Sequence, residues 1–162
     1  EIRWTDPMLD TTVSGCFERM TVASTNPCAE SWIAQFGRQY INDFIHELGF
    51  SDGTSFTTGS ANQTTAADLN KYMKGLNDGT LVKGEYRDRL LESLSKHPYT
   101  YGIPTGSQGQ VYDKVGFLWD YIHDTAIVRH PRGDYVMTIM TQDQSYAAIA
   151  AATREIERIM FP

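Results

Sequence analysis

Apolar residues recur at helical spacing over the first two thirds of the chain and in short strand-like runs over the last third. A spacing of three or four residues predicts amphipathic helices, and apolar runs bounded by turn residues predict strands. The predicted helices cover residues 10–22, 27–36, 39–48, 65–78, 85–96 and 145–161, and the predicted strands cover residues 110–120, 124–130 and 135–141. This order favours an α+β fold, in which the C-terminal helix packs on an antiparallel three-stranded sheet beside a helical part.

Capping and turn residues predict where these elements begin and end. Asp10 is placed to cap the first helix, and Asn26 is placed to cap the second, with Pro27 at its first position. Residues 51–65 are rich in Ser, Thr, Gly and Asn, which predicts a loop. Residues 131–134 supply the hairpin turn between the last two strands.

Size and charge narrow the class of protein. A chain of 162 residues with 41% hydrophobic residues suits one domain, mainly helical over residues 1–109, with the sheet and last helix in residues 110–162. Fourteen basic residues against twenty acidic ones give a net charge of -6 without a basic cluster, which argues against a nucleic acid partner. No apolar run approaches the length of a membrane span, so no membrane partner is expected.

Two short polar motifs carry the candidate chemistry. Residues 24–26 read Ser-Thr-Asn and precede a predicted helix, and residues 114–116 read Lys-Val-Gly within a predicted strand. In this order they resemble the Ser-x-Asn and Lys-[Thr/Ser]-Gly elements of class A β-lactamases and their penicillin-binding relatives. The resemblance covers nearly the whole chain and implies a β-lactamase/transpeptidase-like fold.

The resemblance implies a role for each motif residue. Ser24 would pass a proton toward the leaving group, Asn26 would hydrogen-bond the substrate amide, and Lys114 would place positive charge near the substrate carboxylate. Gly116 and Phe117 would pair with the substrate backbone, the Phe117 N–H being one oxyanion donor. The structural alternatives are a plain helix cap at Ser24 and Asn26, an exposed strand lysine at Lys114 and a bulge glycine at Gly116.

The nucleophile of that family lies in a Ser-x-x-Lys motif N-terminal of Ser-x-Asn, and the residues before Ser24 contain no such motif. We therefore expect residues 1–162 to be one incomplete domain that follows a removed segment. The Ser-x-x-Lys at residues 93–96 comes after Ser24, in the wrong order, and we interpret it as chance.

Three departures from the family pattern bear on activity. Thr25 stands where the family has Asp, which is a mild change. Val115 replaces a Thr or Ser hydroxyl that binds the substrate carboxylate, a loss of about 1–3 kcal/mol in recognition. Residues 51–65 contain no Glu, although class A β-lactamases carry a deacylating Glu in a longer loop there. A fast β-lactamase is therefore disfavoured.

The chain has two cysteines, Cys16 and Cys28, which flank the Ser24 motif. A bridge between them would close a loop of about a dozen residues, worth about 3 kcal/mol, and would hold the turn that presents Ser24. Two separate buried thiols are the alternative. A bridge would favour an extracytoplasmic setting, whether secreted, periplasmic or attached to the cell wall.

The leading hypothesis is a segment of a secreted serine hydrolase that acts on β-lactam or peptidoglycan-peptide amides by acyl transfer. The parent enzyme would be of β-lactamase or D-Ala-D-Ala carboxypeptidase type, and this chain alone would be inactive. Without the missing half, the helices of Cys16 and Trp32 would expose apolar faces, so the expected partners are that N-terminal half or a second copy by domain exchange.

Two other hypotheses stay open. The first is a non-catalytic binding module of the same fold, which recognises cell-wall peptide or a protein partner. The second is an α+β domain whose motifs are coincidental. No metal or cofactor is predicted, because the histidines lack zinc-ligand spacing and no Gly-rich phosphate loop is present.

Overall fold

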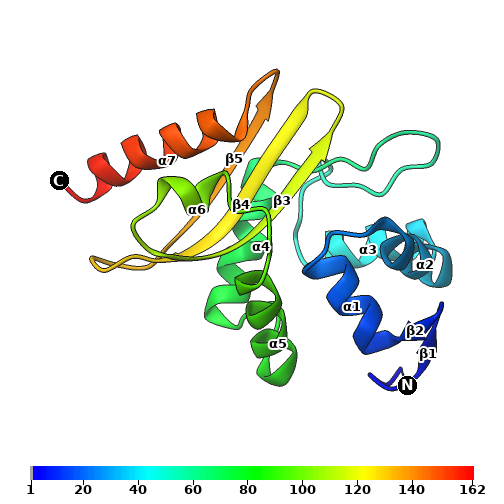
Figure 1. Ribbon diagram of the computed structural model, residues 1–162. Helices are drawn as coiled ribbons and strands as arrows, with labels where there is room; N and C mark the ends of the chain where they lie inside the picture. The colour runs from blue at the N-terminus through cyan, green and yellow to red at the C-terminus, as the bar shows by residue number, and fades with distance from the viewer. Residues whose placement is uncertain (1) are drawn as a thin grey trace. The chain divides into compact units, whose positions relative to one another are not determined.

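The computed structural model describes residues 2–162, which form two compact units (Figure 1). The first unit ends at Thr65, and the second covers Ala66–Pro162. None of the helices in this described part is both long and apolar enough to cross a membrane. Each unit has its own buried cluster of side chains, so each is described by itself.

The first unit consists of a small hairpin and three helices. Its elements are β1 (Pro7–Met8), β2 (Thr11–Thr12), α1 (Val13–Thr21), α2 (Asn26–Phe36) and α3 (Arg38–Glu47). The three helices predicted over residues 10–48 are confirmed, with ends shifted by up to three residues. The buried hydrophobic cluster of this unit is small and comprises Met8, Val13, Cys16 and Cys28.

Both predicted helix caps in this unit are wrong. Thr12, not Asp10, caps α1, and its hydroxyl accepts a hydrogen bond from the Gly15 N–H at 3.2 Å. The β1–β2 hairpin holds the chain extended as far as Thr12, so the helix cannot begin earlier. Asn26 is already helical, and Thr25 precedes α2 without a side-chain capping bond.

The second unit is built around the predicted three-stranded sheet. Its elements are α4 (Ala66–Asp78), α5 (Gly84–Ser95), α6 (Ile103–Gly106), β3 (Gln110–Leu118), β4 (Tyr121–Arg129), β5 (Tyr135–Gln142) and α7 (Tyr146–Met160). The strands are antiparallel in the order β3-β4-β5, which confirms the predicted fold class and leaves β3 at one edge. Short helix α6 was not predicted, and β4 begins three residues before the expected Asp124.

Helices cover both faces of this sheet (Figure 1). On one face Ala126 and Val128 pack with α6 and α7, through Ile103 and Ile149. Ile127 lies between them in sequence and packs on the opposite face, in a cluster with Met73, Leu76 and Leu94 from α4 and α5. Because alternate residues of a strand point to opposite faces, a strand buried on both sides reads as a continuous apolar run.

Candidate functional site

The Ser-x-Asn motif occupies the connection between α1 and α2 in the first unit. Ser24 has a φ of 57°, in the left-handed region that non-glycine residues adopt at some energetic cost. Thr25 ties the connection to the preceding helix, since its N–H and its hydroxyl both donate to the Arg19 carbonyl, at 3.0 and 3.1 Å. Asn26 is exposed, and Ser24 is half-buried. The connection is therefore a defined turn that presents a polar surface.

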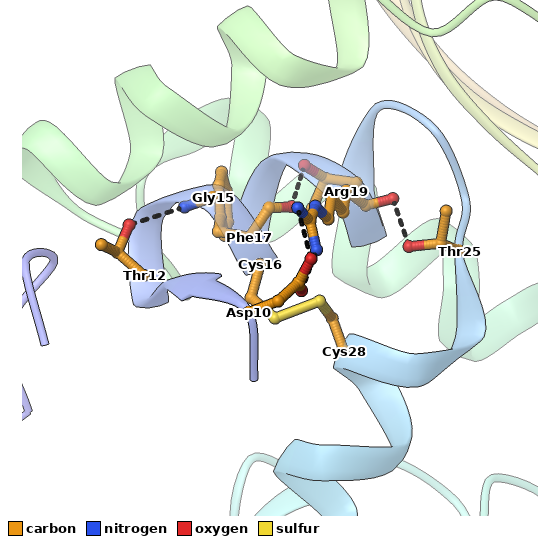
Figure 2. Close-up of a disulfide and its surroundings, with 9 residues drawn as sticks. Asp10, Thr12, Gly15, Cys16, Phe17, Arg19, Thr25 and Cys28 are labelled. Atoms are coloured by element: carbon orange, nitrogen blue, oxygen red, sulfur yellow. Dashed lines mark hydrogen bonds and ion pairs between the residues drawn. A yellow bond between two sulfur atoms is a disulfide. The ribbon is translucent and has the colours of Figure 1, made fainter. Parts of the chain in front are cut away.

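A disulfide fixes the two helices that flank this turn. Cys16 of α1 and Cys28 of α2 are bonded, with 5.3 Å between their Cα atoms, and both side chains are almost fully buried. Figure 2 shows the bridge beneath the Thr25–Arg19 contact and beside the ion pair of Arg19 with Asp10. The predicted bridge is confirmed, and the alternative of two separate thiols is excluded.

The Lys-Val-Gly motif lies on edge strand β3 in the second unit. The Val115 N–H donates to Nε2 of His97 at 3.3 Å, so it points away from β4. Because N–H groups alternate in direction along a strand, the Phe117 N–H points to the same outer side. Phe117 is 59% exposed, and a Cβ added to Gly116 would meet no atom within 4 Å. This part of the edge is open to an incoming extended chain.

Lys114 lies half-buried beside that edge. Its Nζ donates to the Val115 carbonyl at 3.0 Å. Burial lowers the pKa of Lys114, and the negative charges of Asp113 and Asp124 oppose this shift. The side chain of Val115 is buried, with 4% exposure, so only its backbone faces the edge.

Two of these neighbours were not identified from the sequence. Asp113 and Asp124 are buried acids on β3 and β4, and burial raises the pKa of Asp113 to about 8 and that of Asp124 to about 7. The immediate neighbours of both acids in the sequence are polar or aromatic, so no local pattern marked them as buried. His97 was named only as a histidine without ligand spacing, although it contacts the motif strand through Val115.

The other candidate chemistry is accounted for by ordinary packing. Ser93 is buried with 5% exposure on α5, and the Nζ of Lys96 pairs with Oε1 of Glu92 at 2.6 Å. That arrangement supports the interpretation of the downstream Ser-x-x-Lys as chance. Within residues 2–162 there is no group of three or more His, Cys, Asp or Glu side chains that could hold a metal ion.

The structure thus places Ser24 and Asn26 on one connection of the first unit, and Lys114, Val115, Gly116 and Phe117 on one strand of the second. A profile of the β-lactamase enzyme family matches residues 1–161. The chain belongs to the β-lactamase enzyme family.

Solved structures share this fold at low sequence identity. The chain is similar to PBP-A, with a TM-score of 0.84 and 21% identity over 92% of this chain and 61% of that one. It is similar to the extended-spectrum β-lactamase TLA-1, with a TM-score of 0.84 and 16% identity over 94% and 65%. It is also similar to the β-lactamase of Streptomyces albus G, with a TM-score of 0.79 and 19% identity over 92% and 64%.

The matches cover a larger share of this chain than of the similar structures. The chain spans less than two thirds of the length of each of the three, although almost all of it is matched. A search of curated proteins found no matching relative. The fold is therefore that of a β-lactamase enzyme over part of its length.

Proposed function

We propose that this chain supplies the Ser-x-Asn and Lys-Val-Gly part of a serine hydrolase that acts on β-lactam or peptidoglycan-peptide amides by acyl transfer. The observation that carries the proposal is the open β3 edge beside Lys114, within a family whose fold the chain has. An outward N–H at Phe117 suits either an extended peptide or a developing oxyanion. PBP-A, which is similar to this chain, has been captured in a point-mutant form as an acyl-enzyme complex with penicillin G.

Each residue has a defined task in this proposal. Ser24, held by the turn that the disulfide closes, relays a proton toward the leaving nitrogen, and Asn26 donates its amide N–H to the substrate carbonyl. Lys114 lies at the edge of β3 and supplies a positive charge near the substrate carboxylate. Burial already disfavours its charged form, so the negative charge of a bound substrate carboxylate would favour protonation. The backbone of Gly116 and Phe117 forms the strand edge that pairs with the substrate.

The nucleophile is proposed to come from polypeptide outside these 162 residues, so the chain alone should be inert. The test is the intact mass of the chain before and after incubation with penicillin G, together with turnover of a chromogenic cephalosporin. We expect no adduct and a rate equal to that of a Ser24→Ala control. A stable adduct that Ser24→Ala or Ser93→Ala abolishes would show that the chain carries its own nucleophile, and the proposal would be wrong.

A second candidate function is a non-catalytic module that binds cell-wall peptide. Two observations favour it: the buried Val115 side chain offers no hydroxyl, and residues 51–65 contain no Glu. Calorimetry with a peptide ending in D-Ala-D-Ala distinguishes the two functions once the nucleophile-bearing segment is supplied. Binding that Lys114→Met weakens, without any turnover, would favour the module, and turnover would favour the enzyme.

We also propose that a polypeptide partner covers an exposed row of aromatic rings on α2 and α3. Phe36, Tyr40 and Phe44 are 42%, 58% and 49% exposed, and their rings follow that of Trp32 with centroids 5.5, 5.9 and 6.5 Å apart in succession. The row begins on the helix of Trp32, one of the two helices expected to expose an apolar face, and continues on α3. The proposed partner is the nucleophile-bearing half of the domain or a second copy of this chain.

Sedimentation measures whether the aromatic row associates. The 162-residue chain should form dimers at high concentration, and replacing Tyr40 and Phe44 by Ser should return it to a monomer. Replacing the exposed Tyr86 and Tyr101 of the second unit by Ser is a control of matched chemistry. A chain that stays monomeric, and does not bind a supplied N-terminal half, would contradict this part of the proposal.

An extracytoplasmic location is proposed as well. The Cys16–Cys28 bridge supports it, because structural disulfides persist in oxidising compartments and are rare in the cytosol. A thiol reagent should label neither cysteine of freshly isolated protein. Labelling of both would count against this location.

A further inference from the structure

Two buried acidic side chains lie next to the candidate motif on β3. Asp113 is 2% exposed and Asp124 is 0% exposed. Asp113 pairs with Ala126 across the strands, and Asp124 pairs with Val115, so the two acids are diagonal neighbours on one face of the sheet. An isolated charged carboxylate is strongly disfavoured in a protein interior, so buried acids pair with another group or become neutral.

The surroundings of the pair are tightly packed and only partly polar. Oδ2 of Asp124 accepts a hydrogen bond from the Ile103 N–H at 2.8 Å. A Cβ on Gly102 would lie 2.3 Å from the same oxygen, so this position leaves no room for a larger residue. Oδ1 of Asp124 and Oδ2 of Asp113 are buried and lack a hydrogen-bond partner.

A hydrogen bond between the two carboxyl groups, which the diagonal register places side by side, would satisfy both of these oxygens. An ionised carboxylate only accepts hydrogen bonds, so such a bond needs one proton. With that proton on Asp113, Asp113 donates and Asp124 accepts, and both unsatisfied oxygens gain a partner. Burial and the charge of Asp124 raise the pKa of Asp113, which agrees with Asp113 as the donor.

The ionisable groups around the pair come from several elements. Lys114 of β3 is a nearby positive charge, and Tyr146 of α7 interacts electrostatically with both aspartates and with Tyr99. His97 accepts from the Val115 N–H on the outer side of the same strand. One buried negative charge can be balanced by Lys114, whereas two would repel each other beside it.

We propose that Asp113 and Asp124 share one proton at neutral pH, and that this shared proton is a positioning device that keeps the segment from Lys114 to Phe117 in place at the edge of the sheet. The inference rests on the proposed function for the role of that segment. Proton sharing itself does not depend on any activity. Loss of the proton would place two adjacent negative charges inside the sheet, at the point where β3, β4 and α6 meet.

The sign of the pH dependence follows from the direction of the shifts. The folded chain keeps a proton that the unfolded chain releases above the ordinary pKa of 3.8, so stability falls as pH rises from about 4 toward about 8. Because of this one retained proton, the folding equilibrium constant decreases by up to about tenfold per pH unit in this window. Asp113→Asn keeps a hydrogen-bond donor toward Asp124 that cannot ionise, so it should remove this decline.

The experiment is a carbon-detected NMR titration of the aspartate carboxyl groups in the 162-residue chain, alongside urea unfolding from about pH 4 to about pH 8. We expect one of the two carboxyl resonances to titrate above about pH 6. We also expect the stability difference between Asp113→Asn and wild type to grow in favour of Asn as pH rises. Amide exchange at Gly116, whose N–H faces β4, should accelerate above about pH 8 in wild type, beyond the intrinsic effect of pH, and not in Asp113→Asn.

Asp113→Leu is the control, because it has a similar size and no donor. It should destabilise the chain at every pH, since Asp124 then keeps a buried charge with no shared proton. If both wild-type carboxyl groups titrate below about pH 5, or if Asp113→Asn and wild type show the same pH dependence of stability, the proposal is wrong. These readouts are independent of turnover, so a failure of the proposed enzymatic function would leave them unchanged.

Discussion

Replacing Glu157 by Ala should destabilise the second unit by about 3–5 kcal/mol, because three hydrogen bonds to a charged acceptor are lost together. Glu157 of α7 is 4% exposed. Its Oε1 accepts from the Ser107 hydroxyl and from the Tyr135 hydroxyl, each at 2.5 Å, and its Oε2 accepts from the Gln108 N–H at 3.0 Å. Alanine would leave these three donors without their acceptor in a part-buried site.

Loss of Glu157 should also affect the candidate site, because Glu157 holds the residues that lead into β3. Ser107 and Gln108 immediately precede this strand, so Glu157 anchors the chain just before the strand that carries Lys114. The measurement is urea unfolding followed by far-UV circular dichroism. Glu157→Gln is the matched control, since it keeps the shape and one acceptor oxygen and should cost only about 1–3 kcal/mol. Equal effects of Ala and Gln would contradict the network.

Glu157 and the Asp113–Asp124 pair make opposite contributions to the pH dependence of folding stability. Burial tends to raise the pKa of Glu157, but hydrogen bonds from Ser107 and Tyr135 outweigh it, and the pKa lies below its ordinary value. The stability that Glu157 contributes is therefore present above the unfolded pKa of 4.5 and is lost as pH falls through the lower folded value. The aspartate pair loses its contribution as pH rises instead.

Periodicity predicted the main helices and strands because their apolar positions are buried on defined faces. The strand run 126–128 is apolar at every position because α6 and α7 lie on one side and α4 and α5 on the other. The cap at Asp10 was wrong because a hairpin with strands of two residues leaves no periodic signal. Short helix α6 was also missed, since four residues with a Pro and a Gly look like a turn.

The candidate site was predictable only in its local parts. The bridge joins cysteines that are close in the sequence, so the sequence could suggest it, whereas the Ser24 motif was indicated by its resemblance to a family pattern. The Asp113–Asp124 pair depends on the register between two strands, which the sequence does not reveal. The contact of His97 with Val115 depends on how a loop packs against the strand edge.

Removing the Cys16–Cys28 bridge should cost about 3 kcal/mol, because the bridge restricts the unfolded chain over a loop of about a dozen residues. The loss of stability affects the first unit, which has few other stabilising contacts. The buried hydrophobic cluster of the first unit contains four residues, two of which are the cysteines themselves, and α3 contributes no buried residue. A core this small is marginal without a covalent link. The first unit should therefore unfold before the second when the bridge is absent.

The double variant Cys16→Ala/Cys28→Ala tests this expectation. Trp4 and Trp32 lie against the small core, whereas Trp119 is 83% exposed, so tryptophan fluorescence reports mainly on the first unit and circular dichroism on both. The two signals should give separate urea transitions in the variant and in reduced wild type, and closer ones in oxidised wild type. Reducing agent should not affect the variant, and one unchanged transition in all three samples would contradict the prediction.

The same variant separates stability from the presentation of Ser24. The left-handed turn is held by the Thr25 contacts with the Arg19 carbonyl as well as by the bridge. Loss of the bridge frees the first turn of α2, so the Thr25 amide should exchange with solvent at least about tenfold faster under conditions where the chain stays folded. An unchanged exchange rate would mean that the Thr25 contacts alone hold the turn. The bridge would then stabilise the unit without positioning Ser24.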